Sequence, residues 1–226
     1  MARTARVHYT ADTHFDHEFV ATLRGFDSSQ AHDEEVISRW NAVVAPDDIV
    51  FHLGDLSLGL TPAAVDATRR LNGRITLVAG NHDRCWHRSG VSRHDPLRAI
   101  SNVGAYLDAG IERVITSGAM LRNLPGTTQA LILSHLPARL DGTDGPHATW
   151  SGVAPKWGSA AVICGHVHQA WDTYGININV GLDQRGLAPI SEKAVARLVP
   201  KALKHATDVD NTDLITRGPW NALGLA

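Results

Sequence analysis

The sequence is poor in cysteine, has no long apolar run and carries almost no net charge, and each absence excludes a class of protein. Cys85 and Cys164 are its only cysteines, so a disulfide-stabilised extracellular fold is not expected and a reducing cytoplasm fits better. The N-terminal residues lack the apolar core of a signal peptide, and no apolar stretch approaches the roughly 20 residues that span a membrane. The formal net charge of −2 creates no global field toward nucleic acid or acidic membranes. We therefore expect a cytoplasmic protein with no membrane partner.

Histidine, in contrast, is frequent, with 13 residues. It is the commonest metal ligand in proteins, so the positions of these histidines decide what they mean. A chain of 226 residues with 43% hydrophobic content can fill the core of one α/β domain. We expect that domain over residues 1–200, followed by a polar C-terminal tail, 201–226, that could dock on it.

The first half of the chain alternates short apolar runs with amphipathic segments. Strands are expected at 7–11, 49–53 and 74–79, and helices at 33–44, 61–72 and 95–107. This alternation is typical of a parallel, layered α/β core.

The second half is richer in strands and has short connections. Strands are expected at 114–116, 120–124, 129–133, 160–164 and 176–180, and a helix at 192–198 after Ser191. Residues 137–158 are rich in Gly, Pro, Asp and Trp and predict a long loop, which is usually functional or disordered. Together the halves predict a four-layer α/β/β/α sandwich, in which two packed mixed sheets are flanked by helices.

Several expected strands end in residues able to bind metal, and in open α/β sheets these carboxyl ends form the crevice where ligands bind. Side chains two apart in an extended segment point the same way, so the paired ligands of Asp-x-His and His-x-His segments should converge. Gly54, Gly80 and Gly165 allow the chain to turn sharply beside them. The candidate ligands are Asp12, His14, Asp55, Asn81, His82, His135, His166 and His168.

These motifs resemble, in the same order, those of the calcineurin-like metallophosphoesterases. The matching segments are Asp12-Thr-His14, Gly54-Asp55, Gly80-Asn81-His82-Asp83, His135 and Gly165-His166-Val-His168. The opening segment, which continues to His17, is similar to that of the short single-domain phosphoesterases of bacteria and phages. The resemblance covers roughly residues 7 to 198, and each motif is weak alone but specific as part of the ordered set.

The resemblance implies a dinuclear metal centre with Asp55 bridging two ions. Mn²⁺ is the first choice, although Fe, Zn²⁺ or Ni²⁺ also suit these ligands. A metal-bridging hydroxide would attack the phosphorus, and His82 would be the general acid for the leaving group. One ion would be bound by Asp12, His14 and His168, and the other by Asn81, His135 and His166.

One departure from the family concerns phosphate binding. The protein Ser/Thr phosphatases carry an Asp and an Arg after their Gly-Asp, whereas this chain reads Gly54-Asp-Leu-Ser-Leu-Gly59. A protein phosphatase of that branch is therefore disfavoured, and phosphate contacts are expected instead from His17, Arg84 or Arg185.

The expected substrate is a small phosphoester or a nucleotide. A phosphodiester, including a cyclic nucleotide, is slightly favoured over a phosphomonoester because no Arg pair is available to clamp a dianion. A metal-dependent nuclease is an alternative, but nucleic acid is not favoured because no basic groove is evident. A non-catalytic protein-binding scaffold on the same fold is a second alternative, which the complete ligand set disfavours.

Overall fold

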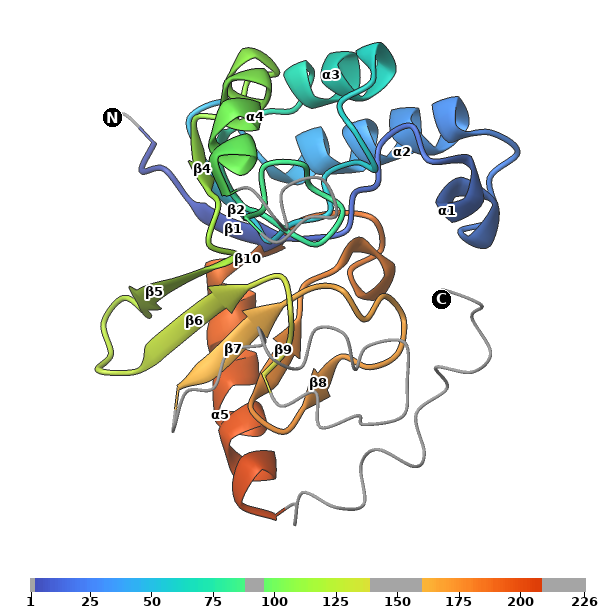
Figure 1. Ribbon diagram of the computed structural model, residues 1–226. Helices are drawn as coiled ribbons and strands as arrows, with labels where there is room; N and C mark the ends of the chain where they lie inside the picture. Colours follow the sequence, from blue (N-terminus) through green and yellow to red (C-terminus); the bar gives the residue numbers. More distant parts are fainter. Residues whose placement is uncertain (1–2, 88–95, 139–159, 209–226) are drawn as a thin grey trace, which may run out of the picture.

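The computed structural model describes residues 3–87, 96–138 and 160–208 and contains two five-stranded sheets (Figure 1). The first sheet has the order β10-β1-β2-β3-β4, and all its strands are parallel except β10, which pairs antiparallel with β1. Its strands are β1 (Val7–Thr10), β2 (Ile49–His52), β3 (Arg74–Val78), β4 (Arg113–Ile115) and β10 (Ile190–Ser191).

The second sheet has the order β5-β6-β7-β9-β8. Its three central strands are parallel, and the edge strands β5 and β8 pair antiparallel with their neighbours. The strands are β5 (Ala119–Asn123), β6 (Ala130–Ser134), β7 (Ala161–Cys164), β8 (Thr173–Tyr174) and β9 (Asn177–Asn179). The expected mixed pairing is therefore confirmed.

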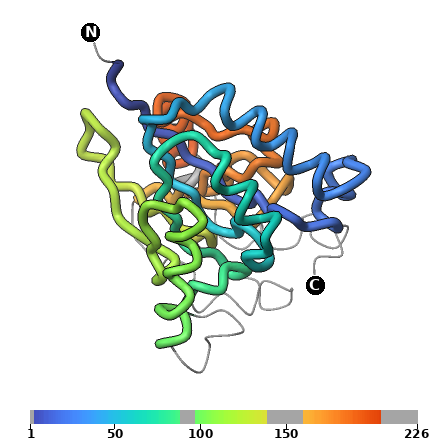
Figure 2. The backbone as a smooth tube through the Cα atoms, turned by 90° about the horizontal axis from the view of Figure 1, so that it is seen from above, coloured from blue at the N-terminus to red at the C-terminus, as the bar shows by residue number. Residues whose placement is uncertain are grey.

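Helices flank the two sheets. Three of them, α2, α3 and α4, form a layer over the first sheet, which Figure 2 shows from above. The helix α5 contacts β7, β8 and β9 of the second sheet and also β1 and β10 of the first. The helices are α1 (Glu18–Leu23), α2 (Ser29–Val43), α3 (Pro62–Arg69), α4 (Pro96–Asp108) and α5 (Glu192–Asp208). The predicted class, an α/β sandwich of two mixed sheets with flanking helices, is confirmed.

The core follows the alternation of side chains along the strands. In β2, Val50 faces the helical layer and packs in one cluster with Trp40 of α2. Phe51 faces the opposite way and packs with Tyr9 and Ile163 between the two sheets. The two buried faces of the first sheet explain why its strands are apolar runs, and they hold the strand ends in fixed positions.

The chain differs from expectation most clearly in α5. A helix was expected at 192–198, but α5 continues through Pro200 to Asp208, so the first residues of the expected tail are helical. Its apolar side continues past the proline, because Val195, Val199 and Ala202 all pack into the core between the sheets. Residues 209–226 of the tail and 139–158 of the expected loop lie outside the described residues. None of the helices in the described ranges has the length and apolar character needed to cross a membrane.

Candidate metal centre

The loops that follow β1, β2, β3, β6 and β7 bring the predicted ligands together. Asp12, His14 and His168 form one group whose ligand atoms all lie within 4.8 Å of one another. A second group with the same spacing is Asp55, His135 and His166. Each group contains residues from loops of both sheets.

Asp55 lies between the two groups. Its Oδ2 is 3.2 Å from His135 Nε2 in its own group and 3.8 Å from His14 Nε2 in the other. The predicted ligand Asn81 joins the second group, because its Oδ1 is 2.9 Å from His135 Nε2. His135 Nε2 is also 3.2 Å from His166 Nδ1. The carboxylate of Asp55 therefore occupies the position from which one side chain could contact two ions.

The ring of His14 is the clearest sign that the centre is built for a cation. Both of its nitrogens are buried without a hydrogen-bond partner among the described residues. Buried polar atoms in folded proteins are nearly always paired, and an exception needs a cause. A bound ion would satisfy one nitrogen of His14, and the oxygen and imidazole donors around it suit a divalent metal.

Five of the seven predicted metal ligands have left-handed backbone conformations rather than extended ones. The φ angles are 60° at Asp12, 49° at His14, 56° at Asp55, 72° at His166 and 45° at His168. The expectation that paired ligands converge because extended residues point the same way is therefore wrong. Tight turns aim these side chains instead, and each non-glycine residue held in this region costs on the order of 1–3 kcal/mol. Such strain is common where function fixes the backbone.

Glycine is required beside the ligands because of close approach. A Cβ on Gly165 would lie 2.6 Å from Asp12 Oδ2, and one on Gly80 would lie 2.7 Å from the backbone nitrogen of Asp55. Gly54 has both a φ of +88° and a close neighbour, since its Cβ would be 2.5 Å from the nitrogen of Gly80. These glycines let the ligand loops touch one another.

The buried charges influence one another strongly. Burial opposes ionisation of Asp55, but His135, His82 and His14 surround it and hold its pKa well below its usual range. Burial alone would lower the pKa of His135, whereas the Asp55 carboxylate raises it to about 9. Burial raises the pKa of Asp12. The surroundings of Asp55 thus favour positive charge beside its carboxylate.

Asp183 and Arg24 support the candidate centre, and neither was predicted from the sequence. Asp183 Oδ2 lies 2.9 Å from His168 Nδ1, which leaves Nε2 of that ring for an ion. The guanidinium of Arg24 donates to both carboxylate oxygens of Asp183 and to the backbone oxygen of Asp12. Asp183 follows β9 as the ligands follow other strands, so its position was a usable signal. Arg24, at the end of α1, offered none.

Asp83 fixes two ligand loops to each other. Its carboxylate accepts hydrogen bonds from the backbone N–H groups of Asp55, Leu56 and Gly80. Burial and the nearby Asp55 raise the pKa of Asp83 to about 7. Asp83 was noted in the sequence as part of a motif, without this role.

Comparison with known proteins gives relatives and a shared fold. No family profile matches the sequence. The gene 66 protein of Mycobacterium phage L5 is 30% identical over 191 residues, which are 79% of this chain and 86% of that protein. The chain belongs to the family of these phage gene 66 proteins.

Two further relatives match this chain over shorter stretches. The gene 66 protein of Mycobacterium phage D29 is 39% identical over 83 residues, 35% of this chain and 41% of that protein. An uncharacterized protein of Methanocaldococcus jannaschii is 36% identical over 83 residues, 35% of this chain and 47% of that protein. A crystal structure of a protein of unknown function from Aquifex aeolicus has a TM-score of 0.58 and 22% identity, covering 87% of this chain and all of that one. That similarity shows the fold.

His82 lies at the edge of the centre in this gene 66 family member. Its Nε2 is 3.9 Å from Asp55 Oδ2, and its side chain is 41% exposed. Its backbone N–H donates to Asp55 Oδ1, which fixes the residue beside the centre. His82 is therefore close to the ligands and open to solvent.

The three predicted phosphate contacts lie in different surroundings. The ring of His17 is half-buried and meets the ring of His14 edge-on, with centroids 5.7 Å apart. Arg84 is exposed, and its guanidinium lies beside Gly59. Arg185 is paired with Asp172 and donates to the backbone oxygen of Asn179. His17 thus packs against a predicted ligand, whereas the guanidinium of Arg185 is already engaged within the protein.

Proposed function

We propose that this protein hydrolyses phosphoester bonds with two divalent metal ions. The observation that carries the proposal is the position of Asp55 between two groups of side chains able to bind metal. One group contains a histidine whose two ring nitrogens have no hydrogen-bond partner in the described parts of the chain. Isolated acidic or histidine residues have many uses, but two adjoining groups that share a carboxylate suit paired ions.

Two sets of side chains would each bind one metal ion. Asp12, His14 and His168 would hold one ion, Asn81, His135 and His166 the other, and Asp55 would contact both. Mn²⁺ is the first choice, with Fe, Zn²⁺ and Ni²⁺ as alternatives. When bound, such a pair activates water at neutral pH and neutralises charge on a phosphoryl group.

His82 would donate a proton to the leaving group. Its exposed ring lies beside Asp55 at the open edge of the centre. A proton held at its Nε2 could pass to the departing oxygen, and general acid catalysis of this kind contributes typically about 10²–10⁴-fold in rate. His17, next to His14, would contact the phosphoryl oxygens from the same edge.

The proposed substrate is a small phosphodiester, including a cyclic nucleotide, rather than a phosphomonoester. Two arginines near the centre, Arg24 and Arg185, are engaged in ion pairs with Asp183 and Asp172. Neither guanidinium is therefore free to clamp the second negative charge of a monoester. Both cysteines are free and buried, which agrees with a cytoplasmic setting.

The test combines metal binding with turnover. Protein stripped with a chelator would be titrated with Mn²⁺ by calorimetry, and the ion content measured by mass spectrometry. The reconstituted protein would be assayed on bis(p-nitrophenyl) phosphate, p-nitrophenyl phosphate and 2′,3′- and 3′,5′-cyclic AMP. We expect about two ions per chain and faster turnover of the diesters.

Two variants and one control locate the activity. Asp55→Asn should lose at least one ion and nearly all turnover, because it removes the shared carboxylate. His82→Ala should keep both ions and lose about 10²–10⁴-fold in kcat. Asp66→Asn, at a side chain that is 72% exposed on α3, is the matched control and should behave as the wild type. A wild type that binds two ions and turns over none of these esters would refute the proposal.

A further inference from the structure

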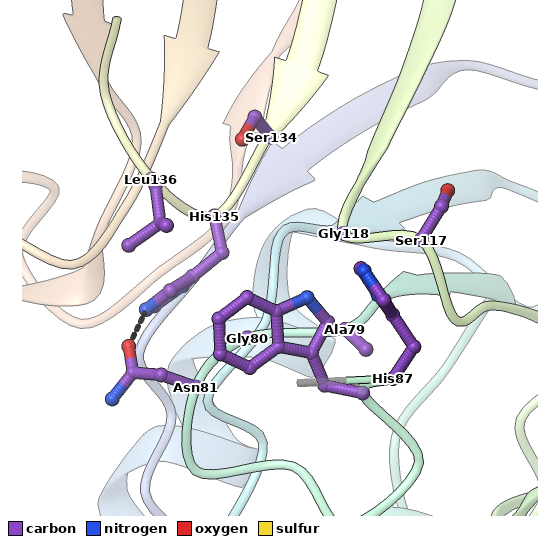
Figure 3. Close-up of a pocket in the computed structure, with 10 residues that line it drawn as sticks. Ala79, Gly80, Asn81, His87, Ser117, Gly118, Ser134, His135 and Leu136 are labelled. Atoms are coloured by element: carbon purple, nitrogen blue, oxygen red, sulfur yellow. Dashed lines mark hydrogen bonds between the residues drawn. The ribbon is translucent and has the colours of Figure 1, made fainter. Parts of the chain in front are cut away.

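A pocket adjoins the second group of ligands. It has a volume of about 230 Å³, and the side chains of Asn81 and His135 form one end of it. Figure 3 shows these two residues at one side and Ser117 and His87 at the opposite side. A phosphoryl group at the metal centre would therefore have this space directly beside it for one of its ester substituents.

One wall of the pocket is formed in part by a buried aromatic side chain. Trp86 lines the pocket and is only 3% exposed. Its indole is seated against the turn between β4 and β5, because a Cβ on Gly118 would lie 2.5 Å from Trp86 Nε1. The ring of His87 meets it edge-on at 5.9 Å, and His87 is itself held by two hydrogen bonds to the backbone oxygen of Thr116. These contacts hold Trp86 and His87 in place.

The rest of the described lining is small and uncharged. Ala79, Gly80 and Gly118 take little space, and none of the lining side chains within the described ranges is Lys, Arg, Asp or Glu. Polar groups are nevertheless present at the far side. Ser117 Oγ donates to Ala119 O and can still accept, and His87 uses Nδ1 for Thr116 O, which leaves Nε2 available. The lining suits a flat, neutral group with hydrogen-bonding edges and disfavours a second phosphate.

We infer that this pocket binds the nucleoside portion of the substrate, with the base against Trp86. A nucleobase is flat, uncharged and edged with hydrogen-bond donors and acceptors. Trp86 offers such a group an apolar contact, and Ser117 and His87 offer hydrogen-bonding atoms. The inference rests on the proposed phosphoesterase function, since it assigns the ester group that extends from the metal centre.

The first test measures binding without phosphate or metal. Adenosine, uridine and ribose would be titrated into the chelator-treated full-length protein and followed by saturation-transfer NMR. We expect both nucleosides to bind and ribose to show no binding. Ser117→Phe would fill the far side of the pocket from an exposed turn position and should weaken nucleoside binding at least tenfold. Ser101→Phe, the same change at an exposed position of α4, should leave binding unchanged.

Trp86→Leu tests the aromatic wall itself and should also weaken nucleoside binding at least tenfold. Because Trp86 is buried, its thermal unfolding must be compared with that of the wild type, and Ser117→Phe carries the test if this variant does not fold. Nucleosides that bind equally to the wild type and to Ser117→Phe, or that bind to neither, overturn the inference.

The second test uses two cyclic phosphodiesters that differ only in the presence of a nucleoside. The ratio of kcat/KM for 2′,3′-cyclic AMP to that for glycerol 1,2-cyclic phosphate should exceed about tenfold in the wild type and fall in Ser117→Phe. Equal turnover of both esters, unaffected by Ser117→Phe, refutes the pocket and leaves the phosphoesterase intact. Adenosine binding that Ser117→Phe abolishes, in a protein that hydrolyses no ester, refutes the phosphoesterase and supports the pocket as a nucleoside site.

Discussion

Single residues outside the ligand set decide how the ligand side chains are oriented. His168 can present only one ring nitrogen to an ion, and its other nitrogen lies 2.9 Å from Asp183 Oδ2. Arg24 in turn holds both oxygens of Asp183. The orientation of the imidazole therefore depends on a carboxylate outside the candidate ligand set.

Asp183→Asn should weaken metal binding without removing a ligand. Loss of such a supporting partner typically costs about 10–100-fold in metal affinity, so calorimetry with Mn²⁺ should show one weakened site and one unchanged site. Asp172→Asn, which removes the ion pairs of Asp172 with Arg185 and Lys201, serves as the matched control. Equal affinities in the wild type and Asp183→Asn would show that His168 needs no support.

Substitution of glycine by alanine should have opposite effects on stability at two positions, Gly165 and Gly104. Gly165→Ala would drive a methyl group against Asp12 Oδ2 and should destabilise the fold by about 1–3 kcal/mol. Gly104 lies inside α4 with nothing within 4 Å of an added Cβ, so Gly104→Ala should stabilise by roughly 0.5–1 kcal/mol. Urea unfolding of both variants checks this. A loss of stability in both would mean that α4 has a neighbour at Gly104.

At the scale of elements, Pro200 is an unfavourable residue in the interior of α5. Proline lacks the N–H that a helix interior uses and its ring crowds the preceding turn. Packing of Val199 and Ala202 keeps the helix intact past it.

Pro200→Ala should therefore raise the free energy of unfolding by about 1–3 kcal/mol, because it restores a helical hydrogen bond. Chemical denaturation monitored by circular dichroism gives the measurement. Lys201→Ala, at the exposed neighbouring position, is the control and should change stability little. A Pro200→Ala variant no more stable than this control would show that the proline carries no cost in α5.

Elements with a strong local pattern could be predicted from the sequence, and elements made by distant pairing could not. The expected strands at 7–11, 49–53 and 74–79 correspond to β1, β2 and β3 because buried parallel strands are apolar runs bounded by turns. β10 has only two residues and exists because it pairs with β1 far away in the chain. α1 is six residues long and its N-cap His17 makes no side-chain capping bond. Pro200 indicated the end of a helix, but α5 continues past it because its apolar side packs into the core.

Some features of the candidate site could likewise be predicted from the sequence, and others could not. Its ligands could be predicted because they directly follow strands, where the topology brings them together. Their left-handed conformations could not, since Asp and His adopt that region only when surrounding contacts impose it. The role of Arg24 depends on the folded positions of Asp12 and Asp183, which local sequence does not encode.

The molecule as a whole should lose stability in acid partly through Asp48, the residue immediately before β2. Burial opposes ionisation of its carboxylate, but hydrogen bonds from Ala45 N–H, Arg3 and Arg6 N–H outweigh it and lower the pKa. A pKa that is lower in the folded state stabilises the fold above the unfolded value, ordinarily 3.8. That contribution disappears as the pH falls through and below this value.

Asp48→Asn should be about 1–3 kcal/mol less stable than the wild type at pH 7, since it weakens several buried hydrogen bonds. The difference between the two proteins should shrink as the pH is lowered toward 3, because the unfolded wild type then takes up a proton at Asp48 that the folded protein does not, which favours unfolding. Urea unfolding at pH 7, 5 and 3.5 tests this. A difference that is constant with pH would show that ionisation of Asp48 contributes nothing.

Each ligand group joins the two sheets. Asp12 and His14 follow β1 and Asp55 follows β2, whereas His135 and His166 follow β6 and β7, and His168 lies in the same loop as His166. An ion in either group would cross-link segments that lie far apart in the chain, Asp12 with His168 or Asp55 with His166, as a disulfide does. This protein has two cysteines, both free and buried, so bound cations would take the place of disulfides as its cross-links. A chelator would then remove the proposed activity and the cross-links between distant loops at the same time.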